Sequence, residues 1–149
     1  MSFENTDYRY EKIDLENPFD VKLVKEFLAK QNFDYNVAEV DSTMILYNLN
    51  RKIIGTGSYK SKTLKFVAVA PEFRETTAFA DIVTFLSNQL LEKYQHTFVF
   101  TRPEKAKLFE GIGYTEIARA EPLYAVLEFG YHTIKNYQDY LKSVKSTLA

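Results

Sequence analysis

Residues 64–79 read LKFVAVAPEFRETTAF, and this order of residue types decides the architecture of the chain. The apolar run that ends at Ala70 predicts an interior strand. Residues 78–94 repeat apolar side chains at helical spacing, so a helix follows, with Thr76 or Thr77 as its N-cap. A strand, a short loop and a helix N-terminus in this order direct backbone N–H groups and the helix dipole at one point. Such a junction suits an anion of the size of a pyrophosphate.

The segments before this junction predict a strand, a helix and a hairpin. Alternation over residues 8–13 is typical of a short strand, and Asn17 with Pro18 is typical of a helix start, with the helix ending near residues 31–32. Residues 43–49 and 52–59 form two strands around a tight turn, and the second strand contains Gly55 and Gly57. Glycines inside a strand mark a bulge or a close approach of another segment.

The segments after the junction continue the alternation of strands and helices. Residues 96–101 predict a strand, residues 105–110 a short helix, and residues 114–119 and 123–129 two further strands. Three consecutive strands followed by a strand–helix–strand unit predict an α/β fold with a mixed, mostly antiparallel central sheet and helices on both faces. We expect residues 1–130 to form this domain and residues 131–149 to form a C-terminal amphipathic helix.

Composition excludes several classes of function. The 149 residues contain 19 Lys and Arg against 20 Asp and Glu, so no basic footprint predicts a nucleic-acid partner or an anionic membrane. The absence of Cys and the presence of only two His residues argue against a metal site. No apolar run is long enough for a membrane helix and no signal peptide is recognisable, so we expect a cytoplasmic protein.

Aromatic residues are numerous, with 12 Phe and 11 Tyr but no Trp. A surface on which bases or sugars stack is one explanation. The rings are spread along the chain and are not clustered with Lys and Arg, so the sequence favours an aromatic-rich core.

Two segments resemble signatures of the GNAT N-acetyltransferase superfamily. Residues 67–79 are similar to its acetyl-CoA pyrophosphate loop, typically Val-x-Pro-x-x-Arg-x-x-Gly-x-Gly/Ala, and residues 108–114 (LFEGIGY) are similar to its Leu-Tyr-Glu-Lys-x-Gly-Phe segment. The resemblance implies a GNAT-like acyl-CoA N-acyltransferase fold. It also implies weak binding of acetyl-CoA or CoA at six positions of the first segment, which are Val67, Val69, Arg74, Thr76, Thr77 and Ala78.

Three departures from these signatures affect binding and catalysis. The first glycine of the loop falls on Thr77 and the second small residue on Phe79, which restricts the approach of a phosphate to the backbone. The tyrosine that often protonates the leaving thiolate in the family falls on Phe109, which has no proton to give. We therefore assign no catalytic residue and no metal ligand.

A narrower resemblance is to the N-terminal region of citrate lyase ligases. It rests on residues 66–69, 98–103, 108–114 and 134–141. In that family the enzyme uses ATP and acetate to acetylate the prosthetic group of the citrate lyase acyl carrier protein, so the resemblance implies this carrier as a partner. The ATP-dependent step belongs to a nucleotidyltransferase-like domain, toward which residues 131–149 would lead. Asn17-Pro18-Phe19 is not followed by a Gly-His pair, so we expect that domain to be absent and this chain to lack the adenylating activity.

Other functions stay open at this point. The chain could be a stand-alone N-acetyltransferase or a non-catalytic module with the same fold. Arg74 fits a phosphate contact or a solvated loop arginine equally well. The lysines at positions 60, 62 and 65 could meet the 3′-phosphate of CoA or an acidic carrier protein, or form a solvated strand face.

Overall fold

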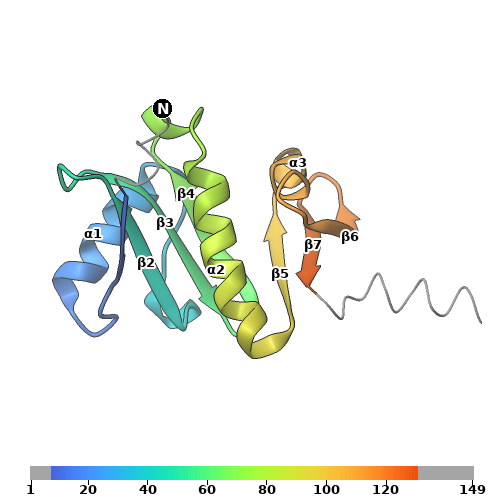
Figure 1. The fold of residues 1–149 in the computed structure, drawn as a ribbon, viewed down its shortest axis with the longest axis horizontal. Coiled ribbons are helices and arrows are strands. Elements are labelled where there is room, and N and C mark those ends of the chain that lie inside the picture. Colours follow the sequence, from blue (N-terminus) through green and yellow to red (C-terminus); the bar gives the residue numbers. More distant parts are fainter. Residues whose placement is uncertain (1–7, 131–149) are drawn as a thin grey trace, which may run out of the picture. The chain divides into compact units, whose positions relative to one another are not determined.

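The computed structural model describes residues 8–130, and the chain divides into two compact units with the boundary between Leu86 and Ser87. The elements follow one another in the predicted order (Figure 1). They are β1 (Arg9–Lys12), α1 (Pro18–Ala29), the 3₁₀ turn η2 (Val37–Glu39), β2 (Ser42–Tyr47), β3 (Ile53–Lys60), β4 (Thr63–Val69), the 3₁₀ turn η3 (Pro71–Phe73), α2 (Ala78–Tyr94), β5 (His96–Thr101), the 3₁₀ turn η4 (Pro103–Lys105), α3 (Ala106–Glu110), β6 (Thr115–Ala120) and β7 (Tyr124–Gly130).

The first unit contains four antiparallel strands in the order β1-β2-β3-β4. Tyr10 pairs with Leu46, Met44 with Gly57, and Gly55 with Val69. Successive residues of a strand point to opposite faces, so each face has its own set of side chains.

Helix α1 packs on one of these faces. Its start is capped as predicted, because the Asn17 side chain accepts a hydrogen bond from the Phe19 N–H at 2.9 Å. Val24 and Leu28 of α1 are fully buried in one core cluster with Ile45 and Tyr47 of β2. The prediction placed the end of α1 two residues too late, because Asn32 adopts a φ of 66° and the Phe33 N–H donates to the Leu28 carbonyl, which closes the helix.

The first half of α2 packs on the opposite face. A Cβ placed on Gly57 would lie 2.5 Å from Cδ1 of Leu86, and one on Gly55 would lie 2.6 Å from the Ala68 carbonyl oxygen and 2.7 Å from Cδ1 of Ile82. Both glycines therefore permit the close approach that their strand positions predicted, and β3 also contains a register shift between Thr56 and Ser58. Helices on both faces are confirmed within this unit.

The second unit contains three antiparallel strands in the order β5-β7-β6. Val99 pairs with Leu127, and Arg119 pairs with Ala125. Phe109 of α3 is 3% exposed and packs edge-on against Tyr114, with ring centroids 5.7 Å apart. Tyr114 is also buried, as are Tyr35 and Tyr47 of the first unit, whereas Phe19, Phe100 and Tyr124 are exposed, so only part of the aromatic content lies in the core.

The outer strand of the second unit, β6, contains two charged residues, Glu116 and Arg119. Arg119 contacts Glu116 at 2.6 Å and Glu121 at 2.6 Å. The hydrogen bonds from Arg119 hold the pKa of the Glu116 carboxyl below its usual value. Within residues 8–130, no strand other than β7 pairs with β6.

The predicted helix beyond residue 131 lies outside the described residues, and the domain boundary at residue 130 stays a prediction. In the described part of the chain, no helix combines the length and the apolar character that a bilayer crossing requires.

Candidate cofactor-binding loop

The six residues predicted to bind a CoA-type group lie on one continuous strand–loop–helix segment of the first unit. Val67 and Val69 belong to β4, Arg74 follows η3, and Thr76 and Thr77 immediately precede α2, which begins at Ala78. The predicted junction is therefore present, with an added 3₁₀ turn over Pro71–Phe73 where the sequence predicted only a loop. Proline at the first position of that turn favours its backbone geometry.

Arg74 is tied to two other parts of the first unit. Its Nε donates to the Val69 carbonyl at 3.3 Å, and its Nη2 donates to Oε1 of Gln31, just beyond α1. A guanidinium carries five N–H groups, and these bonds use two of them. The side chain is therefore held at the end of β4 and retains further N–H groups that could meet an anion.

Thr76 caps α2 with its side chain. Its Oγ1 accepts a hydrogen bond from the Ala78 N–H at 3.1 Å and donates to the Phe73 carbonyl at 2.6 Å. Its own N–H donates to the same carbonyl at 3.2 Å. The backbone N–H groups of Thr76 and Ala78 are thus satisfied within the loop, so an incoming phosphate would have to replace these bonds.

A carboxylate already occupies the first turn of α2. The Asp81 N–H donates to the Thr77 carbonyl, and the Thr77 hydroxyl donates to Oδ2 of Asp81, both at 2.9 Å. A negative side chain near a helix N-terminus is favoured by the helix dipole. The same charge weakens the attraction of this end for a second anion.

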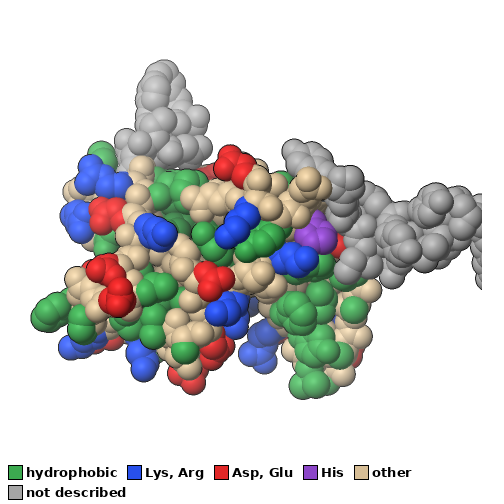
Figure 2. Space-filling view, turned by 90° about the horizontal axis from the view of Figure 1, so that it is seen from below, with side chains coloured by type: hydrophobic (Ala, Val, Ile, Leu, Met, Phe, Trp, Pro, Cys, Tyr) green, Lys and Arg blue, Asp and Glu red, His purple; other side chains and the backbone are tan. Residues whose placement is uncertain are grey.

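Several lysines of the first unit form ion pairs. Lys60 lies 3.3 Å from Asp41, Lys65 lies 3.1 Å from Glu39, and Lys52 pairs with Glu72. The hydrogen bond from Lys52 lowers the pKa of the Glu72 carboxyl. On the face drawn in Figure 2, basic and acidic side chains are interspersed. The structure therefore places acidic partners beside two of the three lysines considered for the 3′-phosphate of CoA.

The position expected for a general acid is occupied by the buried ring of Phe109. The neighbouring Tyr114 hydroxyl is itself buried, and it lies 2.6 Å from the Ser87 hydroxyl and 2.9 Å from that of Thr97. Burial raises the pKa of Tyr114. Sequence reasoning did not find the hydroxyl partners of Tyr114. The available signal was Ser87, a polar residue inside the apolar pattern of residues 78–94.

Sequence reasoning also missed a cavity beside α2, which Asp81 and Tyr10 help to line. Tyr8 and Tyr10 entered the prediction only as evidence for a strand. Tyr8 and Tyr10 are two residues apart in an extended segment, so they share a side of it, and this was a signal. Phe85, which stacks on Tyr10, lies far along the chain. In the part of the chain that the structure describes, no cluster of three or more His, Cys, Asp or Glu side chains could hold a metal ion.

The chain is similar to a curated protein. The chain is 26% identical over 121 residues to the citrate (pro-3S)-lyase ligase of Haemophilus influenzae. The match includes 80% of this chain and 36% of the relative, so the chain spans about a third of the length of the curated protein it matches. No protein-family model matches the sequence.

Solved structures identify the fold. A GNAT-family acetyltransferase from Staphylococcus aureus Mu50 matches with a TM-score of 0.62 and 12% identity, covering 82% of this chain and 99% of that chain. An N-acetylglutamate synthase from Neisseria gonorrhoeae, complexed with coenzyme A and L-arginine, matches with a TM-score of 0.65 and 9% identity, covering 85% of this chain and 34% of that chain. The fold is that of the GNAT acyl-CoA N-acyltransferases, as the sequence predicted.

Proposed function

We propose that this chain acts as the GNAT-like domain of a citrate lyase ligase and that its 67–78 loop receives a CoA-type arm. The observation that carries the proposal is the likeness to a citrate lyase ligase over most of this chain. In the complete enzyme, ATP and acetate would react with the thiol of the carrier protein's prosthetic group, giving the acetyl thioester, AMP and diphosphate. That prosthetic group is CoA-like, so a GNAT-like domain is a chemically suitable receptor for it.

The residues of the second unit support a binding role without acetyl transfer by this domain. Phe109 stands where the resembling family often has its acid, and a phenyl ring cannot protonate a thiolate. The Tyr114 hydroxyl is held by Ser87 and Thr97. We therefore expect no enzyme-like transfer of acetyl groups to amines, and no adenylation of acetate by residues 1–149.

The hydrogen bonds of the loop support weak binding. A phosphate would compete with the Thr76 hydroxyl for the Ala78 N–H, and it would approach the negative charge of Asp81. The remaining N–H groups of Arg74 favour the same ligand. Substituting Thr77 by Gly would remove the side chain at the position where the family has glycine, so we expect it to tighten binding.

The test is a titration of the whole chain with CoA, followed by amide chemical shifts in an ¹H–¹⁵N spectrum. We expect saturable shifts at residues 74–80 and an affinity at least about five-fold higher in Thr77→Gly, equivalent to roughly 1 kcal/mol. Ser61→Gly is the matched control, because Ser61 lies in the β3–β4 turn with a φ of 53°. This turn precedes β4, whereas Arg74 and the start of α2 follow the other end of that strand. Absence of shifts at these residues would contradict the binding proposal.

A stand-alone N-acetyltransferase is the second candidate, and the shared GNAT fold is the observation that favours it. This function predicts release of free thiol from acetyl-CoA in the presence of an amine. A panel of amines, each measured against a reaction without amine, distinguishes the two functions. Robust turnover that is lost in Arg74→Ala would favour the N-acetyltransferase and overturn the ligase-domain proposal.

A further inference from the structure

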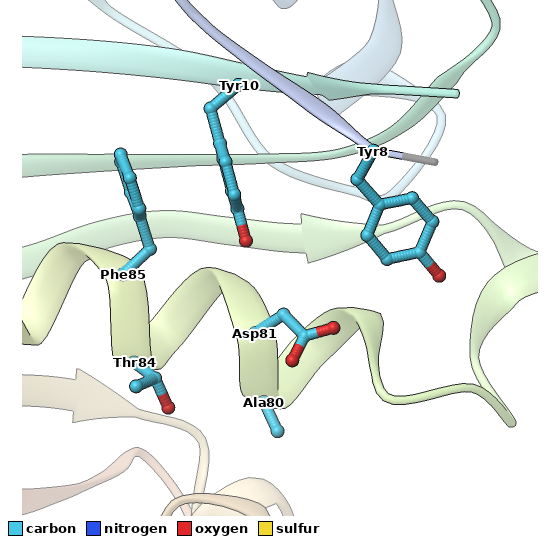
Figure 3. Close-up of a pocket in the computed structure, with 6 residues that line it drawn as sticks. All are labelled: Tyr8, Tyr10, Ala80, Asp81, Thr84 and Phe85. Carbon is cyan, nitrogen blue, oxygen red and sulfur yellow. The ribbon is translucent and has the colours of Figure 1, made fainter. Parts of the chain in front are cut away.

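A surface cavity of about 380 Å³, open to solvent, lies on the first unit beside the first two turns of α2. Figure 3 shows the side chains around it, three of them aromatic and one acidic. The lining residues are Tyr8, Tyr10, Ala80, Asp81, Thr84 and Phe85. A cavity of this size accommodates a small organic group.

The aromatic rings have an ordered arrangement. Tyr10 and Phe85 are stacked, with centroids 4.1 Å apart and an interplanar angle of 4°. Phe85 therefore covers one face of the Tyr10 ring, and the other face is turned toward the side on which Tyr8 lies (Figure 3). The face of an aromatic ring carries negative electrostatic potential and attracts cations.

Asp81 supplies a full negative charge to the same cavity. Figure 3 places its carboxylate between α2 and the two tyrosine rings. Its Oδ2 accepts a hydrogen bond from Thr77, and among residues 8–130 no Lys or Arg lies within ion-pair distance of it. The neighbouring Arg9 lies between Tyr8 and Tyr10 in sequence, so its side chain projects from the other face of β1.

The charge of Asp81 affects the ionisation of Tyr10 in the same cavity. The pKa of Tyr10 is raised to about 12, first by burial and then by the charge of Asp81. The negative potential that opposes ionisation of the tyrosine would stabilise a cation placed next to it.

We propose that this cavity binds an organic ammonium group, with the face of Tyr10 opposite Phe85 and the ring of Tyr8 against the alkyl or methyl groups and Asp81 as the counter-charge. This ligand is distinct in chemistry from the CoA-type anion proposed for the 67–78 loop. A neutral ligand of the same shape would gain only the contact with the rings. An anion would be repelled by Asp81.

The test compares choline with 3,3-dimethylbutan-1-ol, which replaces the ammonium nitrogen by carbon and keeps the shape. Each is titrated into the whole chain at constant ionic strength, and amide shifts of residues 80–85 are followed. We expect saturable shifts with choline and an affinity at least about ten-fold lower for the alcohol. Equal affinity for choline and the alcohol, or no shifts with either choline or butylammonium, overturns the proposal. Butylammonium, measured beside choline, shows whether the site prefers a primary or a quaternary ammonium.

Two variants locate the binding. Asp81→Asn keeps an oxygen that can accept from Thr77 and removes the charge, so we expect it to lower choline affinity at least about ten-fold. The matched control is Asp20→Asn, in the first turn of α1, which should bind choline like the unaltered chain. Tyr8→Leu keeps an apolar side chain and removes a ring, and should weaken choline binding without altering the circular dichroism spectrum. Retention of full affinity in Asp81→Asn overturns the proposal.

Discussion

At the scale of the residue, Thr76 connects the candidate loop to the stability of α2. Its hydroxyl is the side-chain partner of the Ala78 N–H. Thr76→Ala removes this cap and should lower the free energy of unfolding by about 1 kcal/mol. Urea denaturation measures the change. Thr76→Ser retains the oxygen and should stay close to the unaltered protein; equal stability of the Ala and Ser variants would contradict the capping role.

Tyr114 provides a second test at this scale. Tyr114→Phe keeps the ring in the interior but leaves the Ser87 and Thr97 hydroxyls without the oxygen they share. Because unpaired buried hydroxyls are costly, we expect a loss of about 1–3 kcal/mol in the free energy of unfolding. Tyr124→Phe, at an exposed position of the same unit, is the matched control and should change stability little. A loss of similar size in both variants would show that the buried hydroxyls contribute nothing specific.

At the scale of the element, the packing of α2 on β3 depends on the absence of a side chain at Gly55. A Cβ there meets the backbone oxygen of Ala68, which cannot rotate away. Gly55→Ala should therefore lower the free energy of unfolding by about 1–3 kcal/mol. At Gly111 the φ is −64° and the nearest atoms lie 3.5 Å from a Cβ, so Gly111→Ala should be close to neutral. Thermal unfolding of the two variants gives the comparison, and similar midpoints would refute the steric argument.

The elements also show how far the sequence could predict the structure. The bounds of α2 follow from apolar spacing and a threonine cap, both of which are local, and they were predicted correctly. The bond from Arg74 to Gln31 joins residues 43 positions apart, and the stack of Tyr10 on Phe85 joins two elements that no local pattern connects. The loop could therefore be predicted, but the anchoring of its arginine and the neighbouring cavity depend on tertiary packing.

At the scale of the whole molecule, tyrosine ionisation contributes to the response to alkaline pH. Burial raises the pKa of Tyr35, Tyr47 and Tyr114, and that of Tyr10 to about 12 from 10.0. The unfolded chain releases these protons at lower pH than the folded protein does. Their contribution to stability is therefore complete below pH 10 and is lost as the pH rises through the raised values.

Urea denaturation at about pH 8 and about pH 11 should show this loss. Tyr10→Phe should show a smaller difference between the two conditions, because one of the shifted groups is removed. Tyr124→Phe serves as the comparison at an exposed position. Identical pH dependence in Tyr10→Phe and in the unaltered chain would mean that Tyr10 does not contribute.

The guanidinium of Arg119 on β6 is held between Glu116 of the same strand and Glu121 just after it, and this arrangement affects the behaviour of the protein at high concentration. An outer strand offers unpaired backbone groups to which a strand of another molecule can add, and this is a route to fibrils. An intruding strand would have to desolvate three charges that already satisfy one another. Because the pKa of Glu116 is lowered, its carboxylate stays charged in mildly acidic solution, where an ordinary carboxylate begins to lose its charge. The edge of β6 therefore stays protected against strand addition under these conditions.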